Sequence, residues 1–244
     1  MADPVAGVLT TGFDRLVRGG LRGVWLRGRL PAGPFVWAAN HHSWWDPFVA
    51  AALLRHARRT ACLVMLQDNI QWYAFTRRLG VFGSGEVRTG LRYLAEGRAL
   101  VVYPEGGLRP AGPPGPLADG AAWYAHRAGV PLAAVAVRVV LRGQQFPEAY
   151  VSIRSLGSAV PTAASGLASP VSGGASSAAA TAGDVGVLTG VLARTLRDEL
   201  STMDLELAMA DPRTGPTGFR LVLPGRRSWD ERIDALGRRL PWRS

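Results

Sequence analysis

Residues 40–47, Asn-His-His-Ser-Trp-Trp-Asp-Pro, decide the fold class of this chain. They separate an apolar run, residues 34–39, from a helix-like run that begins at Pro47. The first run is typical of a buried strand and the second of the helix that follows it. In α/β proteins the junction between strand and helix commonly carries functional side chains. We therefore expect an α/β domain with a site at this junction.

His41 precedes Asp46 by one tight turn of chain. If the carboxylate reaches one imidazole nitrogen, it fixes the tautomer and leaves the other nitrogen to accept a proton. Such a pair needs no serine or cysteine nucleophile, because it can take the proton directly from a bound alcohol or thiol. A structural interpretation remains open beside this one: Asp46 caps the helix that starts at Pro47, and His41 only packs.

A second polar turn follows a short apolar strand expected before Tyr103. It contains Glu105, Gly106 and Gly107, with Arg109 just beyond them. Glycines allow backbone amides to approach a ligand closely, and an arginine can bind phosphate through its fork of donors. The alternative is a plain turn that ends the strand.

Together the two turns resemble the motifs of the glycerolipid acyltransferases, which acylate glycerol 3-phosphate and lysophosphatidic acid. The residues that match the Asn-His-x-Ser-x-x-Asp motif of that family are Asn40, His41, Ser43 and Asp46. The Phe-Pro-Glu-Gly-Thr-Arg motif is approximated over residues 103–109, where Gly107 replaces threonine and Leu108 displaces the arginine by one position. The resemblance spans roughly residues 30–140.

Two other blocks of the family are less complete. A block that usually ends in arginine corresponds to residues 80–88, although Arg88 comes late in it. A later apolar block corresponds to residues 129–135, which lack its second proline. By resemblance, His41 is the general base and Asp46 orients it. The substrate-binding residues that the resemblance implies are Ser43, Arg88, Glu105, Gly106, Gly107 and Arg109, with Arg88 or Arg109 on the acceptor phosphate.

The implied reaction moves a fatty acyl group from acyl-CoA or acyl carrier protein to a hydroxyl of a lysophospholipid such as 1-acylglycerol 3-phosphate. It involves no acyl-enzyme, no cofactor and no metal. Three alternatives stay open: the same chemistry on another lipid-like alcohol such as a glycolipid or glycosylated terpenoid, hydrolysis with water as acceptor, and a non-catalytic protein that binds membranes or lipids.

The amino-acid composition limits the kinds of partner that the protein is expected to bind. The chain has 244 residues, a net charge of +10 and a pI near 11.1, and all its basic residues are arginine. It shows none of the usual nucleic-acid-binding motifs, so an anionic membrane surface is the expected partner of this charge. The first residues do not predict a signal peptide, and no apolar run reaches the roughly 18 residues expected of a spanning helix. We expect a cytoplasmic protein associated peripherally with the inner face of the membrane, in an oligomeric state that the sequence leaves open.

The chain is long enough for one full core, since 48% of its residues are hydrophobic. The single cysteine, Cys62, lies in an apolar run and is expected to be a buried thiol in a reducing compartment.

We expect a single α/β domain with a central mixed sheet flanked by helices. Residues 1–28 form an N-terminal amphipathic helix that faces either lipid or the core, and residues 29–156 form the catalytic core. Residues 157–184 form a flexible loop, because Ala, Ser and Gly dominate a stretch that carries no charge before Asp184. Residues 185–244 form helices that pack on the core. Within the core, residues 69–79 read as one helix with Trp72 on its apolar side.

Overall fold

The computed structural model describes residues 4–158 and 174–237. Its centre is a sheet in the order β4-β3-β5-β2-β6-β7-β1-β8. The strands are β1 (Gly23–Arg27), β2 (Phe35–Ala39), β3 (Ala61–Met65), β4 (Val81–Gly83), β5 (Ala99–Val102), β6 (Pro131–Val140), β7 (Glu148–Ser158) and β8 (Arg220–Pro224). Pairing is parallel from β4 to β6 and between β7 and β1, and antiparallel for β6 with β7 and β1 with β8. The sheet is therefore mixed, as the sequence predicted.

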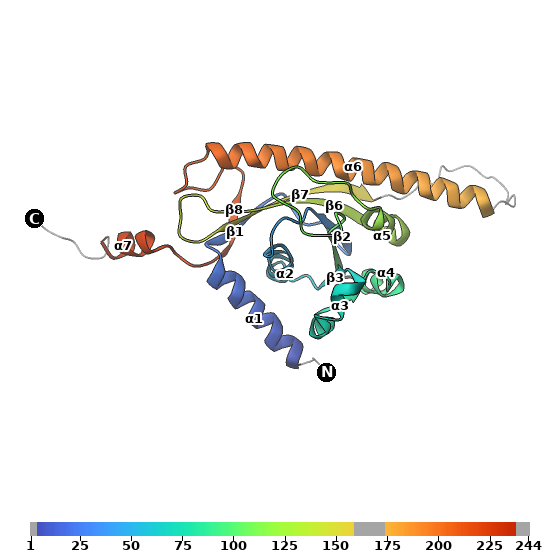
Figure 1. Ribbon diagram of the computed structural model, residues 1–244, viewed down its shortest axis with the longest axis horizontal. Coiled ribbons are helices and arrows are strands. Elements are labelled where there is room, and N and C mark those ends of the chain that lie inside the picture. Colours follow the sequence, from blue (N-terminus) through green and yellow to red (C-terminus); the bar gives the residue numbers. More distant parts are fainter. Residues whose placement is uncertain (1–3, 159–173, 238–244) are drawn as a thin grey trace, which may run out of the picture.

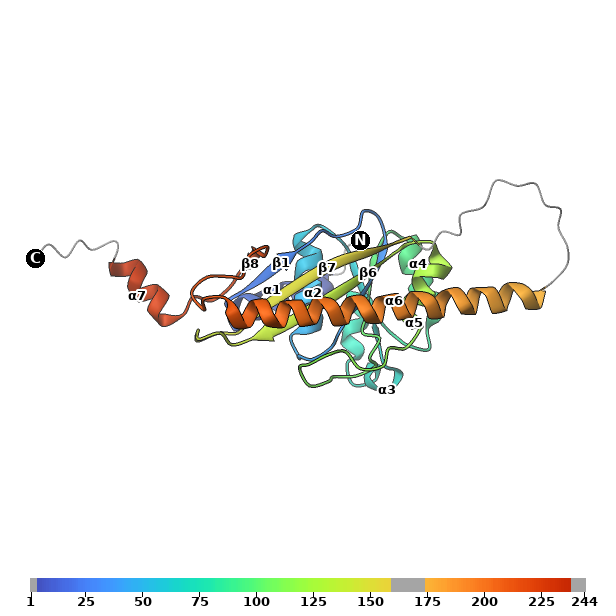
Figure 2. The same ribbon diagram turned by 90° about the horizontal axis from the view of Figure 1, so that it is seen from above.

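Helices cover both faces of the sheet (Figure 1). They are α1 (Pro4–Gly20), α2 (Asp46–His56), α3 (Gln67–Ile70), the 3-10 helix η1 (Ala74–Leu79), α4 (Val87–Ala95), α5 (Gly120–Ala128), α6 (Gly174–Met209) and α7 (Trp229–Gly237). One face carries α1 and α2, and the other carries α4, α5 and α6. Seen from above, α6 crosses the sheet and extends past α5 (Figure 2).

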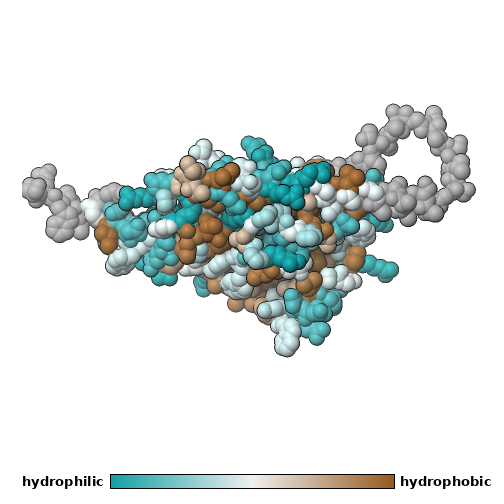
Figure 3. Space-filling model, turned by 45° about the horizontal axis from the view of Figure 1, so that its top comes forward, coloured by the Kyte–Doolittle hydropathy of each residue, from teal (hydrophilic) through white to brown (hydrophobic). Residues whose placement is uncertain are grey.

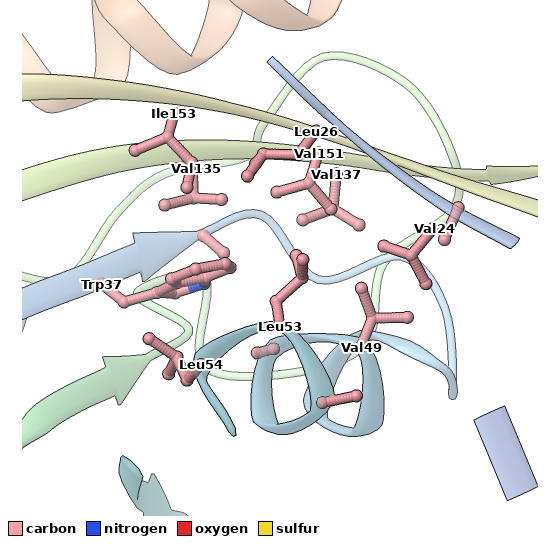
Figure 4. Packing of buried hydrophobic residues seen from close by; sticks show 14 of the residues in the cluster. Val24, Leu26, Trp37, Val49, Leu53, Leu54, Val135, Val137, Val151 and Ile153 are labelled. Atoms are coloured by element: carbon pink, nitrogen blue, oxygen red, sulfur yellow. The ribbon is translucent and has the colours of Figure 1, made fainter. Parts of the chain in front are cut away.

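Strand β2 lies at the centre of the fold and is buried on both faces. Trp37 points toward α2, where Leu54 lies below its ring and Leu53 beside it, while Val135 of β6 lies above it (Figure 4). Its neighbour Val36 points the opposite way, into the layer formed by α4, α5 and α6. A continuous apolar strand is expected where helices cover both sides of a parallel sheet. Truncation of a fully buried leucine such as Leu54 to alanine typically costs about 2–5 kcal/mol of stability.

The N-terminal helix is shorter than predicted. It ends at Gly20, and residues 23–27 form β1, so the expectation of helix across residues 1–28 is wrong there. Glycines end the helix, and the apolar residues after them pair with β7, which is distant in sequence. Val17 is buried in the core, whereas Val8 is exposed. One part of the predicted apolar face therefore packs on the domain and another part remains at the surface.

Two other predicted elements need correction. Residues 69–79 do not form one helix but parts of α3 and η1 joined by a turn, and Trp72 is 83% exposed. The expected loop over residues 157–184 is in part helical, because α6 begins at Gly174. Alanine dominates that part, and it is the strongest helix former. Residues 159–173 of the predicted loop lie outside the described residues.

The C-terminal region divides between two roles. Helix α6 covers the sheet as predicted, with Leu192, Leu196 and Leu200 buried against it. Helix α7 has no buried residue, so the expectation that the whole region packs on the core is wrong for this helix. Within the described residues, no helix has the length and apolar character needed to cross a membrane.

Candidate active site

The site is built on the turn that follows β2. The Asn40 side chain pairs with the backbone of Val137 on β6: its Oδ1 accepts from the N–H at 2.8 Å and its Nδ2 donates to the carbonyl at 3.1 Å. Two residues later, His42 Nε2 accepts from the N–H of Val139 at 3.1 Å. These side chains take the place of the backbone bonds of a parallel ladder. The chain therefore leaves the sheet at this turn, while the side chains of Asn40 and His42 keep the turn hydrogen-bonded to β6.

His41 and Asp46 meet as the spacing predicted. His41 Nδ1 lies 2.8 Å from Asp46 Oδ2, and the same oxygen accepts from the N–H groups of His42 and Ser43 at 2.9 Å each. A carboxylate oxygen with two backbone donors makes Nδ1 the protonated nitrogen of His41. No described residue hydrogen-bonds His41 Nε2, and the side chain is 20% exposed. The pair thus presents a basic nitrogen toward solvent.

The capping interpretation of Asp46 is wrong. The N-cap position of α2 is Trp45, and Asp46 is the first helical residue, with its side chain fully buried. Its carboxylate turns back to the residues before the helix instead of capping the N–H groups within it. Ser43 Oγ accepts from the N–H of Trp45 at 3.2 Å, which closes the turn between the two. Ser43 therefore stabilises the turn.

The second motif packs directly on the first. The rings of Tyr103 and His41 are stacked, with centroids 4.3 Å apart. The Tyr103 hydroxyl is buried without a partner in the described chain, and burial, reinforced by the charge of Asp46, raises its pKa well above the usual value. Tyr103 therefore remains neutral and serves as a flat apolar wall for the imidazole.

Glu105 joins the two motifs through the backbone. Its Oε1 accepts from the N–H of His41 at 3.0 Å, and its Oε2 accepts from the N–H of Gly115 at 2.9 Å. The carbonyl of His41 in turn accepts from the N–H of Arg109 at 2.8 Å. Glu105 is buried, and both of its oxygens are engaged. The structure thus shows Glu105 as a brace between His41 and the proline-rich loop.

The remaining predicted residues are divided in space. Gly106 has a positive φ of 73° and is exposed beside the site, next to Gly107. Arg109 is also exposed, and its guanidinium forms no ion pair with any described residue. Arg88 is exposed as well, but it lies in the first turn of α4, after β4. Strand β4, which precedes Arg88, lies three strand spacings from β2, or about 14 Å across the sheet.

Sequence reasoning missed two structural supports of the site. Burial lowers the pKa of His42, although the charge of Asp46 opposes the shift, so its ring is neutral and can accept from Val139. Arg138 is 2% exposed; it pairs with Asp204 of α6 at 2.6 Å and donates to the carbonyl of Gly112 at 2.8 Å. An arginine inside the apolar run of β6 was the available signal, since buried arginines require partners.

Cys62 is buried, as predicted, and burial raises the pKa of its thiol to about 12. It is therefore protonated at neutral pH and packs as a core residue. Across residues 4–158 and 174–237, no group of three or more His, Cys, Asp or Glu side chains is arranged to hold a metal ion.

Comparison with known proteins agrees with this geometry. Residues 24–138 match the model of a protein family described as Acyltransferase. No curated protein sequence matches the chain. Among solved structures, the chain is similar to the crystal structure of the 1-acyl-sn-glycerophosphate (LPA) acyltransferase, PlsC, from Thermotoga maritima. The two share 14% identity with a TM-score of 0.54, and the match covers 84% of each chain.

The fold and the family match define the chain as an acyltransferase enzyme with a mixed α/β sheet. The motifs at residues 40–46 and 103–109 predicted the glycerolipid acyltransferase family, and the match of residues 24–138 to the Acyltransferase family model supports this prediction.

Proposed function

We propose that the enzyme moves a fatty acyl group from acyl-CoA or acyl carrier protein to a hydroxyl of a lysophospholipid such as 1-acylglycerol 3-phosphate. The observation that carries the proposal is the 2.8 Å contact between His41 Nδ1 and a buried carboxylate oxygen of Asp46. It leaves Nε2 as the base. The reaction uses no cofactor, since the thioester supplies the activated acyl group.

The proton follows a short path in this mechanism. His41 Nε2 takes the proton of the acceptor hydroxyl while the oxygen attacks the thioester carbonyl carbon. Asp46 stabilises the imidazolium that forms. When the tetrahedral intermediate collapses, the carbon–sulfur bond breaks and the imidazolium returns its proton to the departing thiolate. The products are an ester and a free thiol, and no covalent enzyme intermediate forms.

The developing negative charge on the carbonyl oxygen needs a donor. Two backbone amides near the site are already engaged, because Gly106 N–H donates to the carbonyl of Tyr103 and Asp46 N–H to that of Ser43. The N–H of Gly107 has no acceptor among the described residues, and the space beside both glycines is open. We assign the donor role to Gly107.

The acceptor phosphate is assigned to Arg109. The backbone N–H of Arg109 donates a hydrogen bond to the carbonyl of His41, and the guanidinium is exposed without an ion-pair partner in the described chain. Arg88 is farther away across the sheet, so it can bind only a part of the substrate that lies far from the reacting hydroxyl. A guanidinium fork is suited to phosphate because it donates two parallel hydrogen bonds.

We further propose that the enzyme works at the inner face of the cytoplasmic membrane. Exposed Val8 and the basic residues Arg15 and Arg18 of α1 support this proposal, as does the net charge of +10. An apolar surface beside arginines suits a helix that lies in the headgroup layer.

The test is thiol release from acyl-CoA, and separately from acyl carrier protein, with 1-acylglycerol 3-phosphate, glycerol 3-phosphate, other lysolipids, a glycolipid or no acceptor. We expect release that depends on a lysophospholipid and falls about 100- to 10,000-fold in His41→Ala. His56→Ala is the matched control, because His56 is exposed at the end of α2. Release without acceptor means hydrolysis, and release unchanged in His41→Ala rules out this mechanism.

A further inference from the structure

Helix α7 is fixed to the domain by polar contacts at its N-terminus. The N–H of Ser228 donates to Glu231 Oε2 at 2.9 Å, which is one of the two hydrogen bonds of a capping box. The other oxygen of Glu231 accepts from Arg22 Nη2 at 2.8 Å. Buried Ser228 also donates through its hydroxyl to Gln144 in the turn between β6 and β7, at 3.0 Å. The start of α7 is therefore held in place although none of its own residues is buried.

The apolar residues of α7 form one exposed stripe. Trp229, Ile233 and Leu236 are spaced four and three residues apart, so they lie on the same face of the helix. They are 67%, 52% and 58% exposed. Glu231 lies on the opposite side of the helical wheel, and it is this side that binds Arg22. The anchor thus turns the stripe away from the domain, and apolar side chains are visible at that end of the surface in Figure 3.

An arginine cluster adjoins the stripe. A cavity of about 210 Å³ is lined by Gln145, Arg226, Arg227, Trp229 and Arg232, with no carboxylate among them. None of the three guanidinium groups forms an ion pair with any residue in the described parts of the chain. Positive charge is thus concentrated on the Arg232 side of the apolar stripe, whereas the carboxylates Asp230 and Asp234 lie on the other side of the helical wheel.

This end of the molecule lies at the same edge of the sheet as the catalytic turn. The register pairs Pro224 of β8 with Gly23, Gly23 with Glu148, and Glu148 with Val140 at the end of β6. The end of β6 also holds the turn after β2. The sheet order separates β8 from β2 by four strand spacings, or about 19 Å.

We propose that α7, together with Arg226, Arg227 and Arg232, is a docking surface for a bilayer rich in anionic phospholipid. The apolar stripe enters the interface between headgroups and acyl chains, and the arginines bind lipid phosphates. The inference deepens the proposed function, on which it rests, because docking at this edge brings His41 to the surface from which a lipid acceptor enters. The surface is small and highly charged, which favours a lipid occupant over a second copy of the chain.

The test measures binding of the full chain to vesicles of phosphatidylcholine, alone or mixed with phosphatidylglycerol. We expect binding that requires phosphatidylglycerol and weakens with salt. The variant Arg226→Gln/Arg227→Gln/Arg232→Gln is expected to bind about 100-fold more weakly, at about fivefold per arginine. The substitutions Trp229→Ser/Ile233→Ser, added to the arginine variant, are expected to remove most of the vesicle affinity that it retains. Matched controls are Arg194→Gln/Arg197→Gln and Leu205→Ser, exposed positions on α6 that are expected to bind like the unmodified protein.

A second readout separates this proposal from the proposed function. With the acceptor dispersed in detergent, the α7 variants are expected to transfer acyl groups at the unmodified rate, and with the acceptor in vesicles they are expected to be slower. Vesicle binding that is equal in the α7 variants and the unmodified protein overturns the docking surface, even if transfer is observed. Loss of activity only with acyl carrier protein as donor identifies an acidic protein as the occupant and also overturns it. Absence of all transfer in detergent overturns the proposed function, while vesicle binding still decides the role of α7.

Discussion

The Glu105 carboxylate accepts a hydrogen bond from the backbone N–H of His41 at 3.0 Å. Its second oxygen holds the N–H of Gly115 at 2.9 Å. The main chain of the proposed base is therefore positioned by a side chain from the second motif, which also secures the proline-rich loop. The two motifs form one mechanical unit.

Glu105→Gln is expected to weaken this unit. An amide offers only one acceptor oxygen, so its NH₂ group faces one of the two backbone donors. A partly buried donor left without a partner costs about 1–3 kcal/mol. We expect a loss of this size in urea unfolding together with a lower kcat. Glu96→Gln, at an exposed position, is the control, and equal unfolding curves for the two variants would show that Glu105 is not a brace.

Asp46→Asn is expected to lower kcat about 100- to 10,000-fold, because the neutral amide neither fixes the tautomer of His41 nor stabilises its charged form. The residues act as a pair, so the double variant with His41→Ala is expected to be no slower than His41→Ala alone. Steady-state thiol release measures both. Asp198→Asn on α6 serves as the control for loss of a surface charge. Additive losses in the double variant would contradict a coupled pair.

The buried His42 predicts a loss of stability in acid. Burial lowers the pKa of His42 below its ordinary value of 6.5, against the opposing charge of Asp46. The folded state then binds fewer protons than the unfolded state below pH 6.5, so stability present above this pH declines as the pH falls toward the lowered pKa. Arg138, His41 and Asp204 also act on the ring.

Urea unfolding at pH 7.5 and 5.5 would measure this decline. The two values lie about one pH unit above and below the ordinary pKa of histidine. His42→Gln retains an acceptor for the N–H of Val139 but has no titrating ring. We expect the free energy of unfolding to fall less between the two pH values in this variant. An identical decline in both proteins would assign the acid sensitivity to other groups.

Arg142→Met is expected to be strongly destabilising. Arg142 pairs with buried Glu148 at 3.3 Å, donates to the hydroxyl of Tyr150 at 2.7 Å, and binds the carbonyls of Ala210 and Asp211 after α6. Removal of one partner of a buried pair typically costs about 3–5 kcal/mol, and the lower end is expected here because Glu148 keeps its ion pair with Arg22. Denaturant unfolding provides the measurement.

The control for Arg142→Met is Arg77→Met, which breaks the exposed pair with Glu86. Little change in stability is expected there, since solvent screens such pairs. Comparable losses in the two variants would mean that the Arg142 network adds nothing beyond a surface pair.

The contact between His41 and Asp46 is predictable from the sequence because it depends on a few consecutive residues. The alternation of strands and helices is predictable for the same reason. Strand β1 is not predictable in this way. Val24 and Trp25 continue the apolar periodicity of α1, and they form a strand only because they pair with β7. The exposed position of Trp72 also escapes prediction, since an apolar periodicity does not show whether a neighbour covers it.

The role of Glu105 is beyond sequence reasoning for a related reason. Its two partners, His41 and Gly115, lie on different segments, and only the completed sheet brings them together. The same holds for Arg138, whose partner Asp204 belongs to a helix far along the chain. Motifs identify residues with chemical potential, whereas the supports around them depend on contacts between distant segments.

Asn40 and His42 are each bonded to the backbone of β6, so His41 lies between two anchored neighbours. The order of the catalytic turn is therefore established when the sheet forms, before any substrate is present. Such preorganisation means that little conformational entropy is lost at the base when the acceptor binds. We therefore expect discrimination among acceptors to depend on the loops that surround the turn, so that a change of substrate requires substitutions there, with the turn itself unchanged.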